Sequence, residues 1–146
     1  MPDALSLDLQ LCFALHATSR AMTAAYAPVL APLGLTYPQY LVMLVLWEHD
    51  DVAVKDLGAR LHLDSGTLTP LLKRLAADGL VTRRRDPADE RVVRIALTAA
   101  GRALRRRAAG VPQQMLCHIA LSLPELARLR QQLTTLGDRL RDAAAH

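Results

Sequence analysis

The sequence predicts a mainly helical protein that contains one small β-hairpin. Two observations carry this prediction. Apolar residues recur at the spacing of a helix face over most of the 146 residues, and one stretch near position 90 alternates apolar with polar residues beside a turn sequence. The length suits a single domain with one ordinary core, and 51% of the residues are hydrophobic, which is enough to fill that core.

The first predicted helix covers the N-terminal segment up to about Val29, where Pro28 and Pro32 stop or bend it. The residues at helical spacing in this segment are Leu5, Leu9, Cys12, Phe13 and His16. This spacing places Cys12 midway along the helix and away from its N-terminus.

The second predicted helix follows the sequence TYPQ. Thr36 is a candidate N-cap, and Gln39, three residues later, completes a capping-box pattern. The run YLVMLVLW (residues 40–47) is apolar nearly all round, so we expect this helix to be buried.

Two short helices joined by a turn of a few residues come next. Val54, Leu57 and Leu61 share one face of the first. The second lies in DSGTLTPLLKRLAADG (residues 64–79), which supplies capping residues at its start and Gly79 as a stop. Its apolar residues are Leu68, Leu71, Leu72 and Leu75. Such a pair, with the second helix polar and basic on its outer face, is the pattern of a helix-turn-helix.

Pro70 leaves the start of that second helix open. If the helix begins at Ser65, Pro70 lies beyond the first turn and distorts it, because proline has no N–H to donate. A start at Thr67 removes the conflict.

A basic hairpin follows the helix-turn-helix directly. LVTRRRDPADERVVRIAL (residues 80–97) predicts two strands around the turn DPADE, with Val93, Ile95 and Leu97 alternating inward. Its arginines are Arg83, Arg84, Arg85, Arg91 and Arg94. We interpret this hairpin as a wing, and the alternative is an ordinary hairpin that binds nothing.

The C-terminal part is predicted to be helical from about residue 99, with an interruption around Gly110 to Pro112 and a continuation through Cys117. Ser122 and Glu125 then form a second capping-box pattern. Leu126, Leu129, Leu133, Leu136 and Leu140 follow with the spacing of a coiled-coil seam. A seam of this kind either folds back on its own domain or packs with the first helix in a dimer, and we favour the dimer.

The positive charge of the chain is concentrated in one third of its length. Residues 73–107 hold eleven Lys/Arg and four Asp/Glu, a local net charge of +7, while the whole chain carries +4. A solvated basic face also explains such a cluster, but its concentration in an otherwise slightly acidic chain favours a polyanion as partner, with nucleic acid ahead of an anionic membrane surface.

Targeting and redox signals are sparse. Asp3 and Asp8 stand where a signal peptide needs basic residues, and the longest apolar run, residues 40–47, is too short to cross a bilayer. We therefore expect a cytoplasmic protein. Its two cysteines, Cys12 and Cys117, match no disulfide framework or zinc-ribbon spacing, and both should rest as thiols in a reducing compartment.

The sequence DPADERVVRIALTAAG resembles the MarR family of winged-helix regulators, in which an Asp, an Arg two residues later and LT..G close the wing. LCFALHATSRAMTAAY, LTYPQYLVMLVLWEHD and LDSGTLTPLLKRL are similar to the organic-hydroperoxide-sensing, OhrR-type branch. The resemblance covers essentially the whole chain. It implies a homodimer that binds palindromic double-stranded DNA, with a winged helix-turn-helix at approximately residues 50–98 and dimerisation helices at approximately 5–33 and 112–143.

The resemblance also assigns DNA-binding residues. One helix of each subunit would enter a major groove, and Arg91 of the wing would enter the neighbouring minor groove, with Asp89 holding either Arg91 or the turn. The full set of candidates is Ser65, Thr67, Thr69, Lys73, Arg74, Arg84, Arg85, Asp89 and Arg91.

Cys12 has two interpretations. From the residues alone it is a small apolar core residue. The resemblance makes it the peroxide-reactive thiolate, held by the hydroxyls of Tyr26 and Tyr37, while His16 stands where family members often carry another tyrosine and is either a further support or a space-filler. The apolar surroundings favour a fatty or aromatic hydroperoxide over hydrogen peroxide.

The resemblance further implies that Cys117, from the other subunit, converts an oxidised Cys12 to a disulfide and that DNA is then released. Three alternatives stay open. They are a thiol peroxidase or hydrolase that uses Cys12 and His16, a metal sensor that uses Cys12, His16, Cys117 and His118, and a regulator released by a phenolic ligand with both cysteines incidental. We expect a regulator, not an enzyme, and no cofactor.

Overall fold

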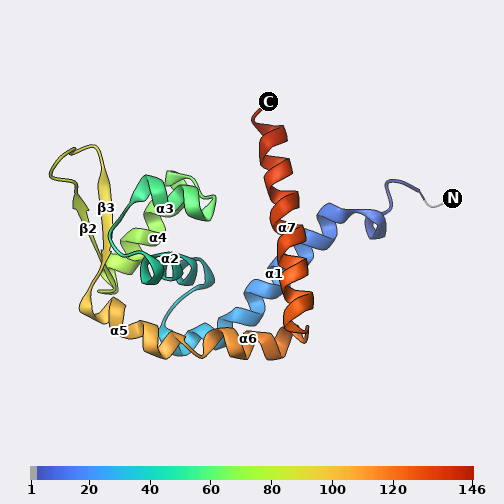
Figure 1. Cartoon of the computed structure of the whole chain (residues 1–146), viewed down its shortest axis with the longest axis horizontal. Coiled ribbons are helices and arrows are strands. Elements are labelled where there is room, and N and C mark those ends of the chain that lie inside the picture. Colours follow the sequence, from blue (N-terminus) through green and yellow to red (C-terminus); the bar gives the residue numbers. More distant parts are fainter. Residues whose placement is uncertain (1–2) are drawn as a thin grey trace. The chain divides into compact units, whose positions relative to one another are not determined.

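The computed structural model describes residues 3–146 and confirms a mainly helical chain with one small antiparallel sheet (Figure 1). One compact unit of the chain ends at Pro112, and a second begins at Gln113. The first unit holds the sheet and the helices α1 to α5, and the second holds the C-terminal helix α7.

The first helix begins later than the sequence predicts. Residues Leu7–Leu9 form a short 3-10 helix, Gln10 is extended, and α1 spans Leu11–Leu30. The predictions that this helix includes Leu5 and that Cys12 lies midway along it are therefore wrong, because Cys12 is the second residue of α1.

The side chain of Gln10 explains the late start. Its amide nitrogen donates to the carbonyls of Ala4 (2.7 Å) and Ser6 (2.9 Å), and a continuous α-helix would give the second of these carbonyls to the backbone N–H of Gln10 instead. At the other end, Pro28 lies inside α1, and a 3-10 turn at Ala31–Leu33 follows the last residue of the helix.

Helix α2, Tyr37–Glu48, is capped and buried as the sequence predicts. Thr36 N–H donates to Gln39 Oε1 (3.0 Å), and the Gln39 N–H donates to Thr36 Oγ1 (3.4 Å), which completes the capping box. The core residues of this helix are Tyr40, Val42, Met43, Val45 and Leu46. Leu44 alone of the inner apolar run stays 40% exposed.

The helix-turn-helix consists of α3, Val54–Leu61, and α4, Ser65–Ala77. His62 adopts a left-handed conformation (φ 56°) and turns the chain sharply between them. Gly58 is needed at this turn, because a Cβ there would lie 2.7 Å from the carbonyl oxygen of Leu63.

The start of α4 is Ser65, so Pro70 lies inside the helix. Because proline has no N–H, the carbonyl of Gly66 lacks its usual helical donor. At the same end of the helix, the N-cap residue Asp64 satisfies a different group, since its Oδ1 accepts from the Thr67 N–H at 2.7 Å.

The wing belongs to a three-stranded antiparallel sheet with strand order β1-β3-β2. Strands β2, Val81–Arg85, and β3, Val93–Leu97, were predicted from the sequence, and β3 buries Ile95 and Leu97 as expected. Strand β1, Val52–Ala53, was not predicted, because two residues show no alternation; it pairs Val52 with Ile95.

Three helices follow the sheet: α5, Ala99–Ala108; α6, Val111–Ile119; and α7, Leu123–Ala144. The break between α5 and α6 and the Ser122–Glu125 capping box agree with the sequence-based prediction. In α5, Gly101 allows close packing, because a Cβ there would collide with the carbonyl oxygen of Leu80.

No residue of α7 is buried in the single chain. Leu129, Leu133 and Leu140 of its predicted seam are 43%, 44% and 59% exposed, although they repeat at the spacing of a packed face. Across residues 3–146, no single helix is long and apolar enough to cross a membrane; only Leu11–Leu33 and Tyr37–Glu48 taken together, bent by 66°, have the combined length and composition.

Candidate nucleic-acid interface and thiol site

Helix α4 presents a polar face away from the core. Leu68, Leu72 and Leu75 are fully buried, and the opposite side carries the predicted DNA-binding residues. Of these, Ser65, Thr67, Lys73 and Arg74 are exposed, and Thr69 is half-buried. Helix α4 can therefore enter a groove with four of the five predicted side chains outermost.

Two residues of this outer face escaped the sequence-based assignment. Gly66 and Pro70 are both exposed on α4, between the polar side chains. Because glycine has no side chain and the proline ring is flat, a binding partner of α4 can approach the backbone of its first turns closely. The signal was present in the helical spacing, which places both opposite the buried leucines.

Asp89 organises the tip of the wing. Its carboxylate accepts from the backbone N–H of Arg91 (3.1 Å) and from the Arg91 guanidinium at Nε (3.1 Å) and Nη2 (3.2 Å). The hydrogen bonds from Arg91 lower the pKa of Asp89, so this pair stays charged. The Arg91 side chain is 91% exposed, so the tip presents an oriented guanidinium to solvent.

The other predicted wing arginines hold the hairpin together. Arg85 Nη1 donates to the carbonyl of Glu90 (2.8 Å), which closes the turn. Arg84 forms an ion pair with Asp51 (2.7 Å), a residue outside the hairpin. Both remain exposed, but part of their hydrogen-bonding capacity is already used within the chain.

Cys12 and His16 are exposed on α1, one helical turn apart. Cys12 lies in the first turn of the helix, where the backbone N–H groups have no intrahelical partner and favour a negative charge. The expectation that this site lacks a helix N-terminus is therefore wrong. Cysteine in such a position is suited to nucleophilic chemistry.

All three tyrosines of the chain form one cluster. The ring centroid of Tyr26 lies 4.8 Å from that of Tyr37 and 5.7 Å from that of Tyr40. Burial raises the pKa of each, and the neighbouring Tyr37 raises that of Tyr26 further. Their hydroxyls therefore stay protonated at neutral pH and can donate hydrogen bonds.

The tyrosine cluster does not reach Cys12 of the same chain. Cys12 and Tyr26 are fourteen residues apart on one helix, and a rise of 1.5 Å per residue separates them by about 21 Å along its axis. Tyr37 packs against Tyr26 with the two rings tilted by 41°, so it belongs to the same distant group. A single chain thus brings Tyr26 and Tyr37 together but leaves the thiol apart.

A pocket of about 690 Å³ opens beside the tyrosines, between the start of α2 and the side of α4. Its wall is largely apolar, and it includes Tyr37 from the tyrosine cluster together with Thr67 and Arg74 from the DNA-binding candidates. The volume is in the range of small-molecule sites. A ligand in this pocket would touch both a candidate sensor residue and the helix proposed to read DNA.

Cys117 lies in α6 and is exposed, as is the following His118. Both cysteines are free thiols. Among residues 3–146, no three His, Cys, Asp or Glu side chains gather in a way that could hold a metal ion.

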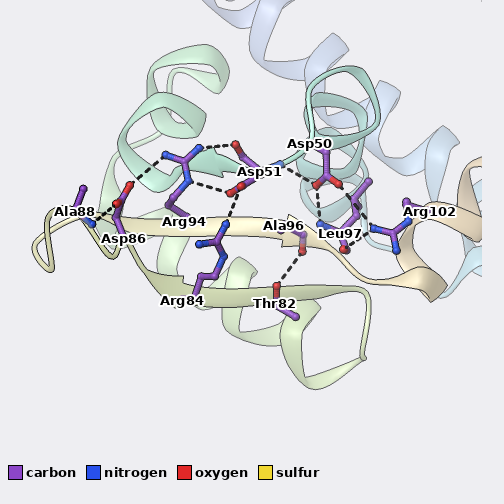
Figure 2. Close-up of polar contacts among 10 residues, drawn as sticks. All are labelled: Asp50, Asp51, Thr82, Arg84, Asp86, Ala88, Arg94, Ala96, Leu97 and Arg102. Carbon is purple, nitrogen blue, oxygen red and sulfur yellow. Dashed lines mark hydrogen bonds and ion pairs between the residues drawn. The ribbon is translucent and has the colours of Figure 1, made fainter.

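The sequence-based assignment also missed an acidic pair that contacts the wing. Asp50 and Asp51 follow α2, and Figure 2 shows Asp51 beside Arg84 and Arg94 and Asp50 beside Leu97 and Arg102. The only sequence signal was two consecutive aspartates shortly after an apolar helix, and the arginines that they contact lie more than 30 residues later in the chain.

Comparisons with known proteins find similar transcriptional regulators. The model of the transcriptional regulator SarA/Rot family matches residues 24–107. The organic hydroperoxide resistance transcriptional regulator of Bacillus subtilis (strain 168) is 48% identical over 94% of both chains.

Two solved structures of AbfR, a protein of Staphylococcus epidermidis, are also similar. Reduced AbfR bound to DNA is 34% identical, with a TM-score of 0.77 over 92% of this chain and 93% of that one. Disulfide-formed AbfR is 36% identical, with a TM-score of 0.63 over 89% and 91%.

Proposed function

Because the chain belongs to the SarA/Rot-type, MarR-like family of transcriptional regulators, which are not enzymes, we propose that it is a DNA-binding repressor that senses organic hydroperoxides through Cys12. The observation that carries this proposal is the 48% identity, over 94% of both chains, with an organic hydroperoxide resistance regulator. The exposed thiol in the first turn of α1 supports it chemically. Such a repressor works where its operator lies, in the cytoplasm.

The DNA interface would consist of α4 and the wing tip. The outer face of α4 would enter a major groove, and the guanidinium of Arg91 would enter the adjacent minor groove, which attracts positive charge. A palindromic operator presents two half-sites about 34 Å apart, so binding requires two copies of the chain. Affinity should fall steeply with salt, by roughly one log-log unit for each phosphate contacted.

The dimer would be built from the N- and C-terminal helices. The exposed leucines of α7 repeat at seam spacing, and Leu11 and Phe13 of α1 are 62% and 43% exposed. Apolar residues at these positions are costly to leave in water. A second copy of the chain would cover them and would contribute a second α1 to the assembly.

The second copy would also complete the sensor. Since Tyr26 lies about 21 Å from Cys12 along α1, the tyrosine hydroxyls that hold a thiolate must come from the other chain. The protonated hydroxyls of Tyr26 and Tyr37 would donate hydrogen bonds to the sulfur. His16, exposed one turn after Cys12, would lie at the edge of this site.

Oxidation would proceed in two balanced steps. The Cys12 thiolate attacks the outer oxygen of the hydroperoxide, the O–O bond breaks, and the leaving alkoxide takes a proton to give an alcohol, with sulfur oxidised to sulfenic acid. The Cys117 thiol of the other chain then attacks that sulfur, and water leaves as the disulfide forms. The bond would shift the dimer helices and change the spacing of the two DNA-reading lobes.

The pocket beside Tyr37 favours an organic peroxide over hydrogen peroxide. Its apolar wall has room for a fatty or aromatic group whose peroxide end meets the thiol near the tyrosine. The same pocket favours one second candidate function, release of DNA by a small phenolic ligand without cysteine chemistry.

A gel shift tests the proposal. Wild-type protein should bind a palindromic operator and lose it after one equivalent of cumene hydroperoxide, and dithiothreitol should restore binding. Cys12→Ser should bind and ignore the peroxide, whereas Cys117→Ser should react but stop at a sulfenic acid. Release of Cys12→Ser as readily as wild type would reject Cys12 as the sensor, and release of both proteins by salicylate alone would favour the ligand-controlled alternative.

A further inference from the structure

The wing contains a charge conflict that the hairpin itself resolves only in part. Arg84 on β2 and Arg94 on β3 are directly paired in the register of the sheet, so their side chains leave the same face. Two like charges directly opposite each other on neighbouring strands destabilise a hairpin. Asp86 of the turn lies 3.6 Å from Arg94 Nη1, but the ion pair of Arg84 is with a residue outside the hairpin.

Asp51 is that residue (Figure 2). Its Oδ2 lies 2.7 Å from Arg84 Nη2, and its Oδ1 lies 2.9 Å from Arg94 Nε. Arg94 Nη2 also donates to the backbone carbonyl of Asp51 at 2.7 Å. One residue thus holds both strands of the wing, and the hydrogen bond from Arg94 lowers the pKa of its carboxyl.

The neighbouring Asp50 fixes the same loop to the rest of the lobe. Its Oδ1 accepts from the backbone N–H of Leu97 at the end of β3 (2.8 Å) and from the N–H of Asp51 (2.8 Å). Asp50 Oδ2 lies 3.9 Å from Arg102 on α5. The loop after α2 is therefore tied to β3 and α5, and Asp51 extends from a fixed point.

The contribution of this contact to folding stability does not account for its geometry. Asp51 and Arg84 side chains are 41% and 47% exposed, and ion pairs this exposed contribute little to folding. The three hydrogen bonds to Asp51 nevertheless come from two strands. They therefore fix the orientation of the hairpin, although they bury little surface. Arg91, oriented by Asp89, lies in the turn just beyond this pair, with only the Arg85–Val93 pair between them in the ladder.

We propose that Asp51 is a positioning residue for DNA binding: by holding Arg84 and Arg94 it fixes the direction in which the wing presents Arg91. This rests on the proposed contact of Arg91 with the minor groove. Asp51 itself meets no DNA, and it acts through the hairpin.

The direction in which one substitution changes operator affinity distinguishes this role from that of a simple surface charge. Asp51→Asn removes a negative charge from the DNA-binding lobe and frees two arginines, so electrostatics alone predicts tighter binding. Loss of a positioning contact predicts weaker binding. Asparagine also tolerates the left-handed conformation of Asp51 (φ 58°), so the substitution adds little backbone strain.

The experiment measures operator affinity against salt for full-length wild type, Asp51→Asn, Arg91→Ala and the double variant. We expect Asp51→Asn to bind about tenfold more weakly and to lower the salt slope by about one unit, as Arg91→Ala does. The double variant should bind no more weakly than Arg91→Ala, because both changes remove the same contact. Asp56→Asn, an equal charge change in the first turn of α3, should bind as well as wild type or better.

Each outcome has one meaning. Unchanged or tighter binding by Asp51→Asn overturns the proposal, and so do effects of Asp51→Asn and Arg91→Ala that multiply. If Arg91→Ala binds like wild type, the proposed wing contact itself fails. Asp51→Gly, which also accepts the left-handed conformation, should reproduce Asp51→Asn, and both should unfold within a few degrees of wild type.

Discussion

The DNA-reading lobe and the terminal helices differ in how much of their packing one chain supplies. In the lobe, Leu57, Leu68, Leu72 and Ile95 are all 0% exposed. In α7 no residue is buried, and Leu123 and Leu140 are 68% and 59% exposed. The lobe is complete in one copy, whereas the apolar residues of α7 need another surface.

The chemistry divides in the same way. One chain holds every part of the proposed DNA contact, from the capped start of α4 to the Asp89–Arg91 pair. The parts of the proposed sensor are separated along α1, with the thiol at its start and Tyr26 near its end. In the proposed function, reading DNA is therefore a property of each lobe, and sensing peroxide is a property of the dimer.

The largest expected effect comes from breaking the terminal helices. Leu133→Asp places a charge in the leucine seam of α7 and should give a monomer by light scattering, with operator affinity reduced more than about 100-fold because one half-site is lost. Far-UV circular dichroism of the lobe should persist. Gln131→Asp, on the opposite face of α7, should remain dimeric, and a dimeric Leu133→Asp would show that the seam is not the interface.

A second change targets the lobe instead. Leu72→Ala leaves a cavity among fully buried leucines and should lower the free energy of unfolding by about 2–5 kcal/mol, measured in urea. The dimer should survive, because Leu72 faces the interior of the lobe. Leu72→Met, which keeps the volume, should cost less than about 1.5 kcal/mol. A loss below 1 kcal/mol for Leu72→Ala would mean that the lobe is not packed as described.

A smaller effect is expected where the wing meets α5. Thr98 Oγ1 accepts from the Gly101 N–H (3.0 Å) and donates to the carbonyl of Gly79 (2.6 Å). Thr98→Ala should lower the free energy of unfolding by about 1 kcal/mol through loss of this cap. Thr98→Ser retains the hydroxyl and should stay near wild type. Equal losses in both variants would assign the effect to the methyl group.

The smallest expected effect is a dependence of folding stability on pH in the acidic range. The Thr67 N–H lowers the pKa of Asp64 below its ordinary value of 3.8, so the folded state favours the charged carboxylate. The stability gained this way is present above pH 3.8 and is lost as pH falls through the lower folded pKa. The stability difference between wild type and Asp64→Asn should therefore shrink below pH 3.8, and a difference independent of pH would contradict it.

Local signals explain why much of the fold was predictable. The capping boxes at Thr36 and Ser122 each need only residues three positions apart, and both form as expected. The start of α1 was missed because the side chain of Gln10 binds carbonyls in the preceding turn, a contact that apolar spacing does not reveal.

The site was predictable in its outer residues and not in its long-range contacts. Exposure of Arg74 and Arg91 follows from helix and hairpin patterns. The bonds from Asp51 to Arg84 and Arg94 join residues 33 and 43 positions apart, and no local pattern specifies them. The separation of Cys12 from Tyr26 was available from the sequence, because the helix predicted up to about Val29 already contains both residues, and α1 contains them as well.

A mixed-dimer experiment tests most directly the claim that two chains complete the sensor. Cys12→Ser and Cys117→Ser proteins are mixed, allowed to exchange subunits, treated with one equivalent of cumene hydroperoxide and run on a non-reducing gel. Each variant alone lacks one partner of the disulfide, whereas a mixed dimer holds one Cys12 and the other chain's Cys117. The account predicts a dithiothreitol-sensitive band at dimer mass in the mixture and in wild type, and none in either variant alone. A mixture without that band, beside a wild-type monomer whose peptide map joins Cys12 to Cys117, would contradict it.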